Sequence, residues 1–176
     1  MLKLIWFPIS RMNKKEAQKI AREILTKEFQ NIKIKKSEKG KPYIQGKDLK
    51  VSFTYTKFLG CIALSNEDVG IDIEYIDKDF PWRDLTWVLT EREKDIIFTL
   101  DKQKQRKAFF QIWTQKEAFL KLLGTGFEIP PEEIDTTTLK ENFSVISRIF
   151  LYEKHLFAGS LITRSGMEDE KATPSV

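Results

Sequence analysis

The sequence predicts an α+β protein in which helices and antiparallel strands are mixed within each half of the chain. A helical pattern near the N-terminus is followed by short alternating segments joined by polar turns. A longer helical region then follows, and more alternating segments come after it. We therefore predict two similar halves, residues 1–76 and 77–164, although the letters contain no clear repeat. The polar tail, 165–176, is predicted to be disordered.

The first half opens with a strand and a helix. Residues 2–9, LKLIWFPI, are extended and apolar, whereas NKKEAQKIAREILTKEF at 13–29 has apolar residues at helical spacing and Asn13 in position to cap the helix. Residues 31–36, NIKIKK, alternate as a strand does. Residues 39–48, KGKPYIQGKD, combine turn residues with a short extended piece.

Further strands and a long helical region complete the chain. Three strand candidates are separated by short polar connections: KVSFTYT at 50–56, GCIALS at 60–65 and VGIDIEYI at 69–76. The pattern is helical from about Asp84 to Leu123, with an interruption near Asp101. Residues 138–162 predict more strands with a turn at YEKH. The single histidine, His155, falls in that turn and is interpreted as structural.

Composition bounds the class of protein. A chain of 176 residues has the size of one domain or of two small halves, and 41% apolar residues are enough for a core. One cysteine excludes an internal disulfide and fits a reducing cytosol, and one Cys with one His excludes a Cys/His metal site. The apolar start is too short to span a bilayer. We predict a soluble, cytoplasmic protein with no membrane partner.

Charge is distributed unevenly along the chain. The net charge of +4 combines 14 Lys/Arg and 5 Asp/Glu in residues 1–50, a balance of +9, with 16 and 21 in the remainder, a balance of −5. Such a division indicates a polyanionic partner near the first half, whether a phosphate ligand, a nucleic acid or an acidic protein. A solvated basic helix is the alternative.

Two carboxylates interrupt the strand pattern DVGIDIEYID at 68–77. Alternate side chains of a strand point to opposite faces. One face is apolar and typical of a core: Val69, Ile71, Ile73 and Tyr75. The other face carries Gly70, Asp72 and Glu74, and we expect Gly70 to leave it open beside the two acids.

A third carboxylate lies in the helical stretch WTQKEAFLKLLGTG at 113–126. An apolar stripe at helical spacing comprises Phe109, Ile112, Trp113, Leu120 and Leu123. Glu117 borders this stripe, where a carboxylate tends to lose hydration and therefore needs a cation or strong hydrogen-bond donors. Lys121, four residues further on, could be that cation, and a simple surface ion pair between the two is the alternative. If Glu117 meets Asp72 and Glu74, the three cannot all stay ionised without a cation. An all-oxygen set suits Mg²⁺.

Together these stretches resemble the signature of the 4′-phosphopantetheinyl transferases. The pattern is Gly-x-Asp-x-Glu at 70–74, followed by Trp-x-x-Lys-Glu-x-x-x-Lys at 113–121. GKP at 40–42 and the strand VSFTYT also match, so the resemblance covers about residues 38–128. Because the first motif lies mid-chain, the match is to the larger, surfactin-synthetase-activating type. That type implies a pseudo-twofold monomer of two α+β halves.

The resemblance implies an enzyme that transfers the 4′-phosphopantetheine arm of coenzyme A to a serine of an acidic apo acyl or peptidyl carrier protein, releasing adenosine 3′,5′-bisphosphate. By matching position, Asp72, Glu74 and Glu117 would bind Mg²⁺, and Glu117 would also be the catalytic base. Lys121 would contact the pyrophosphate, in both a catalytic and a binding role. Lys41 would hold the coenzyme phosphates, and Thr54 would help.

One position departs from the family pattern. The family has Ser-His-Ser where this chain has Thr54-Tyr55-Thr56, and that histidine contacts the 3′-phosphate of the coenzyme. If Tyr55 takes the place of that histidine, it binds the coenzyme by facing the 3′-phosphate, where it can donate a hydrogen bond but carries no charge. Because its strand neighbours Val51 and Phe53 are apolar, a core aromatic is the alternative interpretation. Two rival functions stay open: another Mg²⁺-dependent phosphotransferase or nuclease, and a non-catalytic carrier-binding homologue. The chain has neither a P-loop nor a stacking platform of basic and aromatic residues, so we expect no nucleic-acid partner.

Overall fold

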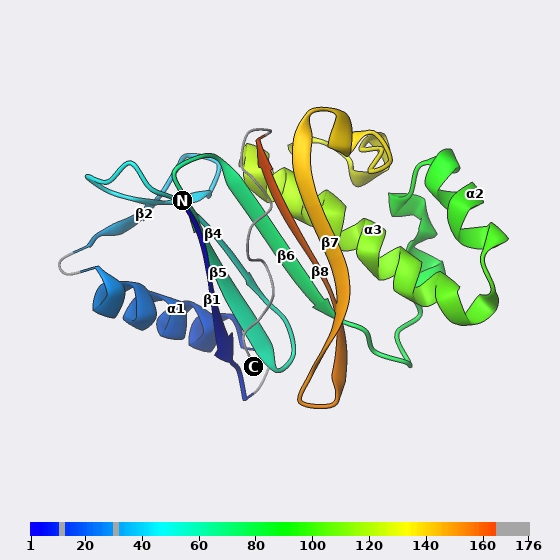
Figure 1. The fold of residues 1–176 in the computed structure, drawn as a ribbon, viewed down its shortest axis with the longest axis horizontal. Helices are drawn as coiled ribbons and strands as arrows, with labels where there is room; N and C mark the ends of the chain where they lie inside the picture. The colour runs from blue at the N-terminus through cyan, green and yellow to red at the C-terminus, as the bar shows by residue number, and fades with distance from the viewer. Residues whose placement is uncertain (11–12, 30–31, 165–176) are drawn as a thin grey trace.

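The computed structural model describes residues 1–10, 13–29 and 32–164 and has the predicted α+β architecture (Figure 1). The strands are β1 Leu2–Pro8, β2 Ile34–Lys36, β3 Pro42–Ile44, β4 Lys50–Tyr55, β5 Leu59–Ser65, β6 Val69–Tyr75, β7 Phe143–Tyr152 and β8 His155–Arg164. The α-helices are α1 Lys14–Glu28, α2 Glu91–Thr99 and α3 Lys102–Leu123. Short 3₁₀ helices span Trp82–Val88, Gly126–Glu128, Pro131–Glu133 and Leu139–Glu141.

The strands form two antiparallel sheets. The first has five strands in the order β1-β5-β4-β3-β2, and the second has three in the order β6-β8-β7. The connection between the sheets is short, because β6 begins four residues after the end of β5. β6 is an edge strand of the second sheet. The edge of β6 that does not pair with β8 lies next to β4 of the first sheet.

Local sequence accounts for the ends of the helices. The Asn13 side chain accepts hydrogen bonds from the backbone N–H of Lys15 (3.0 Å) and Glu16 (3.4 Å), so the predicted N-cap of α1 is confirmed. Helix α3 ends at Gly124, whose φ of 73° is left-handed and is readily adopted by glycine. The predicted interruption near Asp101 separates α2 from α3.

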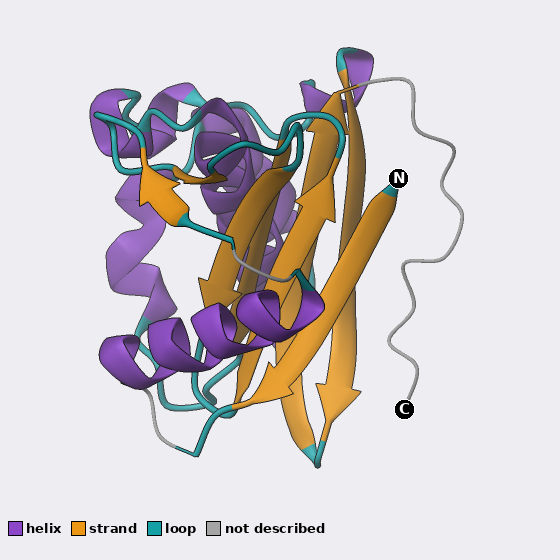
Figure 2. Cartoon of the chain, turned by 90° about the vertical axis from the view of Figure 1, so that its left-hand side faces the viewer, coloured by secondary structure: helices purple, strands orange, loops and turns teal. Residues whose placement is uncertain are grey.

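The two sheets lie between two helices. Helix α1 packs Ala17, Ala21 and Leu25 against the outer face of the first sheet, and α3 packs against the second sheet (Figures 1 and 2). A separate core joins the inner faces of the sheets: Cys61 and Ala63 from β5, Val69 and Ile71 from β6, and Leu161 from β8. The apolar face predicted for β6 is therefore the face buried between the sheets.

The predicted elements differ from the structure mainly at their ends. The strand predicted at 31–36 begins at Ile34, and the helical region predicted from Asp84 begins as a 3₁₀ helix at Trp82. The predicted disordered tail lies outside the described residues. The division at residues 76 and 77, and the pseudo-twofold relation of the halves, stay predictions. No helix in the described part of the chain is long and apolar enough to cross a membrane.

The expectation for Gly70 was wrong. A Cβ atom there would lie 1.8 Å from the carbonyl oxygen of Ala118 and 2.6 Å from the nitrogen of Leu122. The glycine therefore allows α3 to approach the backbone of β6, and this part of the strand face is covered. As a result, Glu117 and Lys121 on α3 lie over the strand that carries Asp72 and Glu74.

Candidate active site

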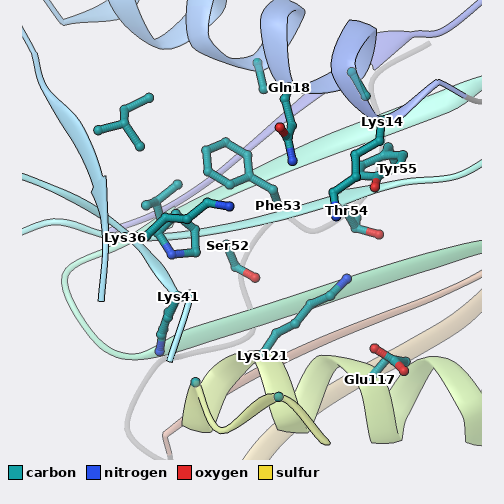
Figure 3. Close-up of a pocket in the computed structure, with 18 of the residues that line it drawn as sticks. Lys14, Gln18, Lys36, Lys41, Ser52, Phe53, Thr54, Tyr55, Glu117 and Lys121 are labelled. Carbon is teal, nitrogen blue, oxygen red and sulfur yellow. The ribbon is translucent and has the colours of Figure 1, made fainter. Parts of the chain in front are cut away.

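A cavity of about 380 Å³ lies beside β4, between α1 and the C-terminal half of α3 (Figure 3). β4 pairs with β3 only at Lys50, so most of its length on that side faces the cavity. The described lining includes six cationic side chains, Lys14, Arg22, Lys36, Lys39, Lys41 and Lys121. Its one acidic side chain is Glu117. The cavity is therefore suited to an anionic ligand.

Three of these cations have no acidic partner in the described structure: Lys14, Arg22 and Lys36. Lys14 and Lys36 extend from α1 and β2 into the cavity, and Lys121 reaches toward them from α3 (Figure 3). No motif in the sequence indicated Lys14, Arg22 or Lys36 individually. The excess of positive charge in residues 1–50 was the signal that pointed to them.

Asp72 is the most buried of the predicted metal ligands, with 4% of its surface exposed. Its Oδ1 accepts hydrogen bonds from Thr54 Oγ1 at 3.0 Å and from Lys121 Nζ at 2.7 Å. Its Oδ2 is also buried, and no hydrogen-bond partner for it exists among the described residues. Burial raises the pKa of Asp72, and Lys121 opposes that rise. One oxygen of Asp72 therefore remains available to a ligand.

Glu74 and Glu117 share the electrostatic environment of Asp72. Thr56 Oγ1 donates to Glu74 Oε2 at 3.1 Å. Burial, followed by the charge of Asp72, raises the pKa of Glu74 to about 8. The same two causes raise the pKa of Glu117 to about 7. The structure thus brings the three carboxylates into mutual repulsion, as the combined motifs predicted.

The chemistry of this set fits a divalent cation. The side chains offer oxygen atoms only, and Asp72 Oδ2 has no hydrogen-bond partner among the described residues. Burial, together with mutual repulsion, raises the pKa values of Glu74 and Glu117, so the charged forms of these carboxylates would be stabilised by a cation. Among the described residues, no three acidic, His or Cys side chains are gathered closely enough to form a finished metal site. The ammonium of Lys121 is bound to Asp72 in this arrangement and supplies part of the missing charge.

Two residues predicted to bind the coenzyme have different environments. Lys41 Nζ donates to the carbonyl oxygen of Leu122 and lies 3.7 Å from Asp68 Oδ1, so its ammonium points away from the cavity (Figure 3). Burial lowers the pKa of Lys41. Tyr55 lines the cavity, as a coenzyme-binding residue would, and it also packs against the core of the first sheet, as a core aromatic would. The roles of both residues stay predictions.

Lys116, the lysine next to Glu117 in the signature, makes contacts that stabilise the fold. Lys116 is fully buried and forms an ion pair with Glu93 of α2 at 2.6 Å. It also donates to the carbonyl oxygens of Pro131 (2.8 Å) and Ile134 (2.6 Å). These bonds attach α3 to α2 and to the following loop, on the side of the helix away from the cavity.

His155 lies outside the cavity, immediately after the turn between β7 and β8. Its ring stacks on Phe58 with the centroids 3.9 Å apart and contacts the edge of Tyr75. This packing agrees with its interpretation as a structural residue.

Comparison with known families decides the assignment of the fold and signature. A sequence model of the 4′-phosphopantetheinyl transferase superfamily matches residues 68–162, which contain Asp72, Glu74, Glu117 and Lys121. The chain belongs to this superfamily. The α+β fold is consistent with this assignment, and both sequence motifs lie within the matched region.

Individual members of the superfamily are similar over parts of the chain. The 4′-phosphopantetheinyl transferase gsp of Aneurinibacillus migulanus is 28% identical over 144 residues, which are 78% of this chain and 59% of the relative. HetI of Nostoc is 29% identical over 104 residues (54% and 43%), and Sfp of Bacillus subtilis is 25% identical over 116 (63% and 51%). The chain thus spans about three-fifths or less of the length of these relatives.

Proposed function

We propose that this phosphopantetheinyl transferase homologue transfers the 4′-phosphopantetheine arm of coenzyme A to a serine of an acidic apo carrier protein. The observation that supports this most directly is that Glu117 and Lys121 line a cationic cavity and interact with Asp72 and Glu74 beside it. A coenzyme with a pyrophosphate and a 3′-phosphate matches the charge of the cavity, and an acidic carrier matches the basic first half of the chain.

The reaction would be a displacement at phosphorus. The serine hydroxyl oxygen attacks the phosphorus atom attached to pantetheine, a new P–O bond forms, and the bond to the leaving phosphate breaks, which releases adenosine 3′,5′-bisphosphate. Glu117 is the proposed acceptor of the serine proton, directly or through water.

Asp72, Glu74 and Glu117 are the proposed ligands of Mg²⁺. When bound, Mg²⁺ would neutralise charge on the phosphate oxygens that pass through the transition state. Lys121, which forms an ion pair with Asp72, would exchange that bond for one with the pyrophosphate. Lys14 and Lys36 extend toward the same space and are further candidates for phosphate contacts. Lys41 would have to turn away from the end of α3 to make such a contact.

The transfer can be tested by measuring the mass of the carrier protein before and after the reaction. The protein is mixed with coenzyme A, Mg²⁺ and a panel of apo carrier proteins, and each carrier is examined by mass spectrometry. The expected result is a mass increase of one phosphopantetheine arm on a carrier serine. Binding of a carrier without a mass increase would favour the non-catalytic homologue. Cleavage of nucleic acid without carrier modification would favour the nuclease.

The first prediction concerns Glu117. Glu117→Gln keeps the size of the side chain but removes the negative charge, so the rate of transfer should fall on the order of 10²-fold or more, as for loss of a general base. The unfolding midpoint should change little. Glu132→Gln, at an exposed glutamate outside the cavity lining, is the matched control. Wild-type turnover in Glu117→Gln would rule out its proposed role.

A further inference from the structure

A row of three hydroxyl groups, two on β4 and one on Thr56 directly after it, lies along the free edge of β6. Because β6 pairs only with β8, the backbone N–H groups on its other edge need different partners. The hydroxyls accept them in order: Ser52 from Ile71 N at 3.2 Å, Thr54 from Ile73 N at 3.1 Å, and Thr56 from Tyr75 N at 3.2 Å. Each pair is 19 residues apart in sequence, so the row keeps a constant register along β6.

Two members of the row also bind the acidic side chains. Thr54 Oγ1 donates to Asp72 Oδ1 at 3.0 Å, and Thr56 Oγ1 donates to Glu74 Oε2 at 3.1 Å, with the same separation of 18 residues. A hydroxyl has a single proton, so each threonine uses it in this bond. At the corresponding separation from Ser52 the chain has Gly70, which has no side chain to bind.

The threonines can therefore control how the carboxylates are turned. Each hydroxyl is held in place by a backbone N–H group, and threonine has few χ1 rotamers. The position of one carboxylate oxygen is thereby set from a rigid strand. For Asp72 this leaves Oδ2 as the buried oxygen without a partner in the described structure.

We infer that Thr54 and Thr56 are positioning residues that orient Asp72 and Glu74 toward a divalent cation. This differs from the phosphate contact predicted for Thr54. Only 3% of the surface of Thr54 is exposed, and its hydroxyl already donates its proton to Asp72. The inference rests on the metal site of the proposed function. Partners that orient metal ligands commonly change metal affinity on the order of 10- to 100-fold when removed.

Four variants separate positioning from general packing. Thr54→Val and Thr56→Val keep the branched shape but remove the hydroxyl, whereas Thr54→Ser retains it. Ser52→Ala is the matched control, because Ser52 accepts the same kind of backbone bond but has no carboxylate partner in the part of the chain that the structure describes. The probe is Mn²⁺ in the presence of saturating coenzyme A and without carrier, with free Mn²⁺ measured by electron paramagnetic resonance.

Both valine variants should raise the Mn²⁺ dissociation constant on the order of 10-fold or more. Thr54→Ser and Ser52→Ala should stay close to wild type, even though Ser52→Ala also lowers the unfolding midpoint. An equal loss of Mn²⁺ affinity in Ser52→Ala, or no loss in either valine variant, would overturn the inference. If Thr54→Val does not fold, Thr56→Val tests the same relation at Glu74.

A second measurement distinguishes positioning from phosphate binding. With metal removed by a chelator, the coenzyme A dissociation constant should be the same in wild type and Thr54→Val if Thr54 acts only through Asp72. A weaker affinity for coenzyme A under these conditions would assign Thr54 to the phosphates instead. A wild-type protein that binds no Mn²⁺ would reject the proposed metal site, and this inference with it, before any variant is compared.

Discussion

Tyr55 is the residue at which the chain departs from the signature of its family, and its place on the cavity wall allows a direct test. Tyr55→His adds a group that is half charged near pH 6.5. If position 55 faces the 3′-phosphate, the variant should bind coenzyme A more tightly relative to 3′-dephospho-coenzyme A. A charge-assisted hydrogen bond is worth roughly 1.5–3 kcal/mol, so the ratio should change on the order of 10-fold or more.

The measurement compares the dissociation constants of the two ligands at pH 6 and pH 8. The ratio should change more at pH 6, where imidazole is protonated. Tyr55→Phe is the control, since it removes the hydroxyl without adding charge. If Tyr55 is only a core aromatic, Tyr55→His should weaken both ligands alike and lower the stability of the first sheet. An unchanged ratio would remove position 55 from the coenzyme site.

At this scale the sequence predicted which carboxylates meet but not which partners hold them. Strand alternation places Asp72 and Glu74 on one face of β6, whereas the approach of Glu117 was a hypothesis supported by the family resemblance. The bond from Lys121 to Asp72, rather than to its helical neighbour Glu117, depends on the distance between α3 and β6. No periodicity in the sequence contains that distance.

The approach of α3 to β6 is the feature of the elements on which the site depends. Gly70→Ala would place a methyl group against the backbone of Ala118, which cannot rotate away as a side chain could. We expect α3 to shift and the free energy of unfolding to fall by roughly 1–3 kcal/mol or more, the usual cost of overpacking. Because Glu117 and Lys121 move with the helix, transfer should fall further than stability alone would explain.

A second strand glycine provides the comparison. At Gly60, in the first sheet, a Cβ would meet the ring of Phe7 at 2.4 Å, so Gly60→Ala should also destabilise the protein. It should do so without moving α3 relative to β6. Denaturant unfolding and the rate of transfer of the folded protein are measured for both variants. If Gly70→Ala and Gly60→Ala retain equal activity at equal stability, the close packing of α3 on β6 does not position the catalytic groups.

Elements with a strong period were predicted well, and their contacts were not. The helix at 13–29, the strands around Asp72 and the hairpin at YEKH are local patterns, and the structure confirms them. The expectation for Gly70 failed because a missing side chain can mean either open space or a close neighbour. The burial of Lys116 against Glu93 was not predicted for a related reason: a lysine on a helix gives no local sign that a distant glutamate will pair with it.

For the molecule as a whole, the sequence predicted the fold class, and the uneven charge predicted an anionic partner, which stays a prediction. The cavity itself could not be predicted, because its walls come from α1, β2, β4 and α3, which are far apart in the chain. The excess charge of residues 1–50 becomes local only when these elements assemble around the cavity. Glu117 of α3 lines the cavity and interacts with the acidic groups of β6, so protons, Lys121 and a divalent cation can each balance the charge of these carboxylates.

This balance predicts how metal and pH act together on stability. The pKa of Glu74 is about 8 and that of Glu117 about 7 in the folded protein, against an ordinary value of 4.5. Without metal, the folded state therefore holds protons that the unfolded state has already released. The free energy of unfolding should fall as pH rises from about 5 to 8, by about 1.4 kcal/mol at most for each unit of pKa difference.

Mg²⁺ should reverse much of this loss, because it replaces the protons as the balancing charge. The stabilisation that Mg²⁺ adds in the presence of coenzyme A should therefore be larger at pH 8 than at pH 6. Denaturant unfolding with Mg²⁺ and with a chelator, at both pH values, measures the difference and cancels the titration of groups elsewhere. Asp72→Asn should reduce the Mg²⁺ effect at each pH. A stabilisation that is independent of pH would mean that the carboxylates release no protons when the metal binds. The proposed ligand set would then be wrong.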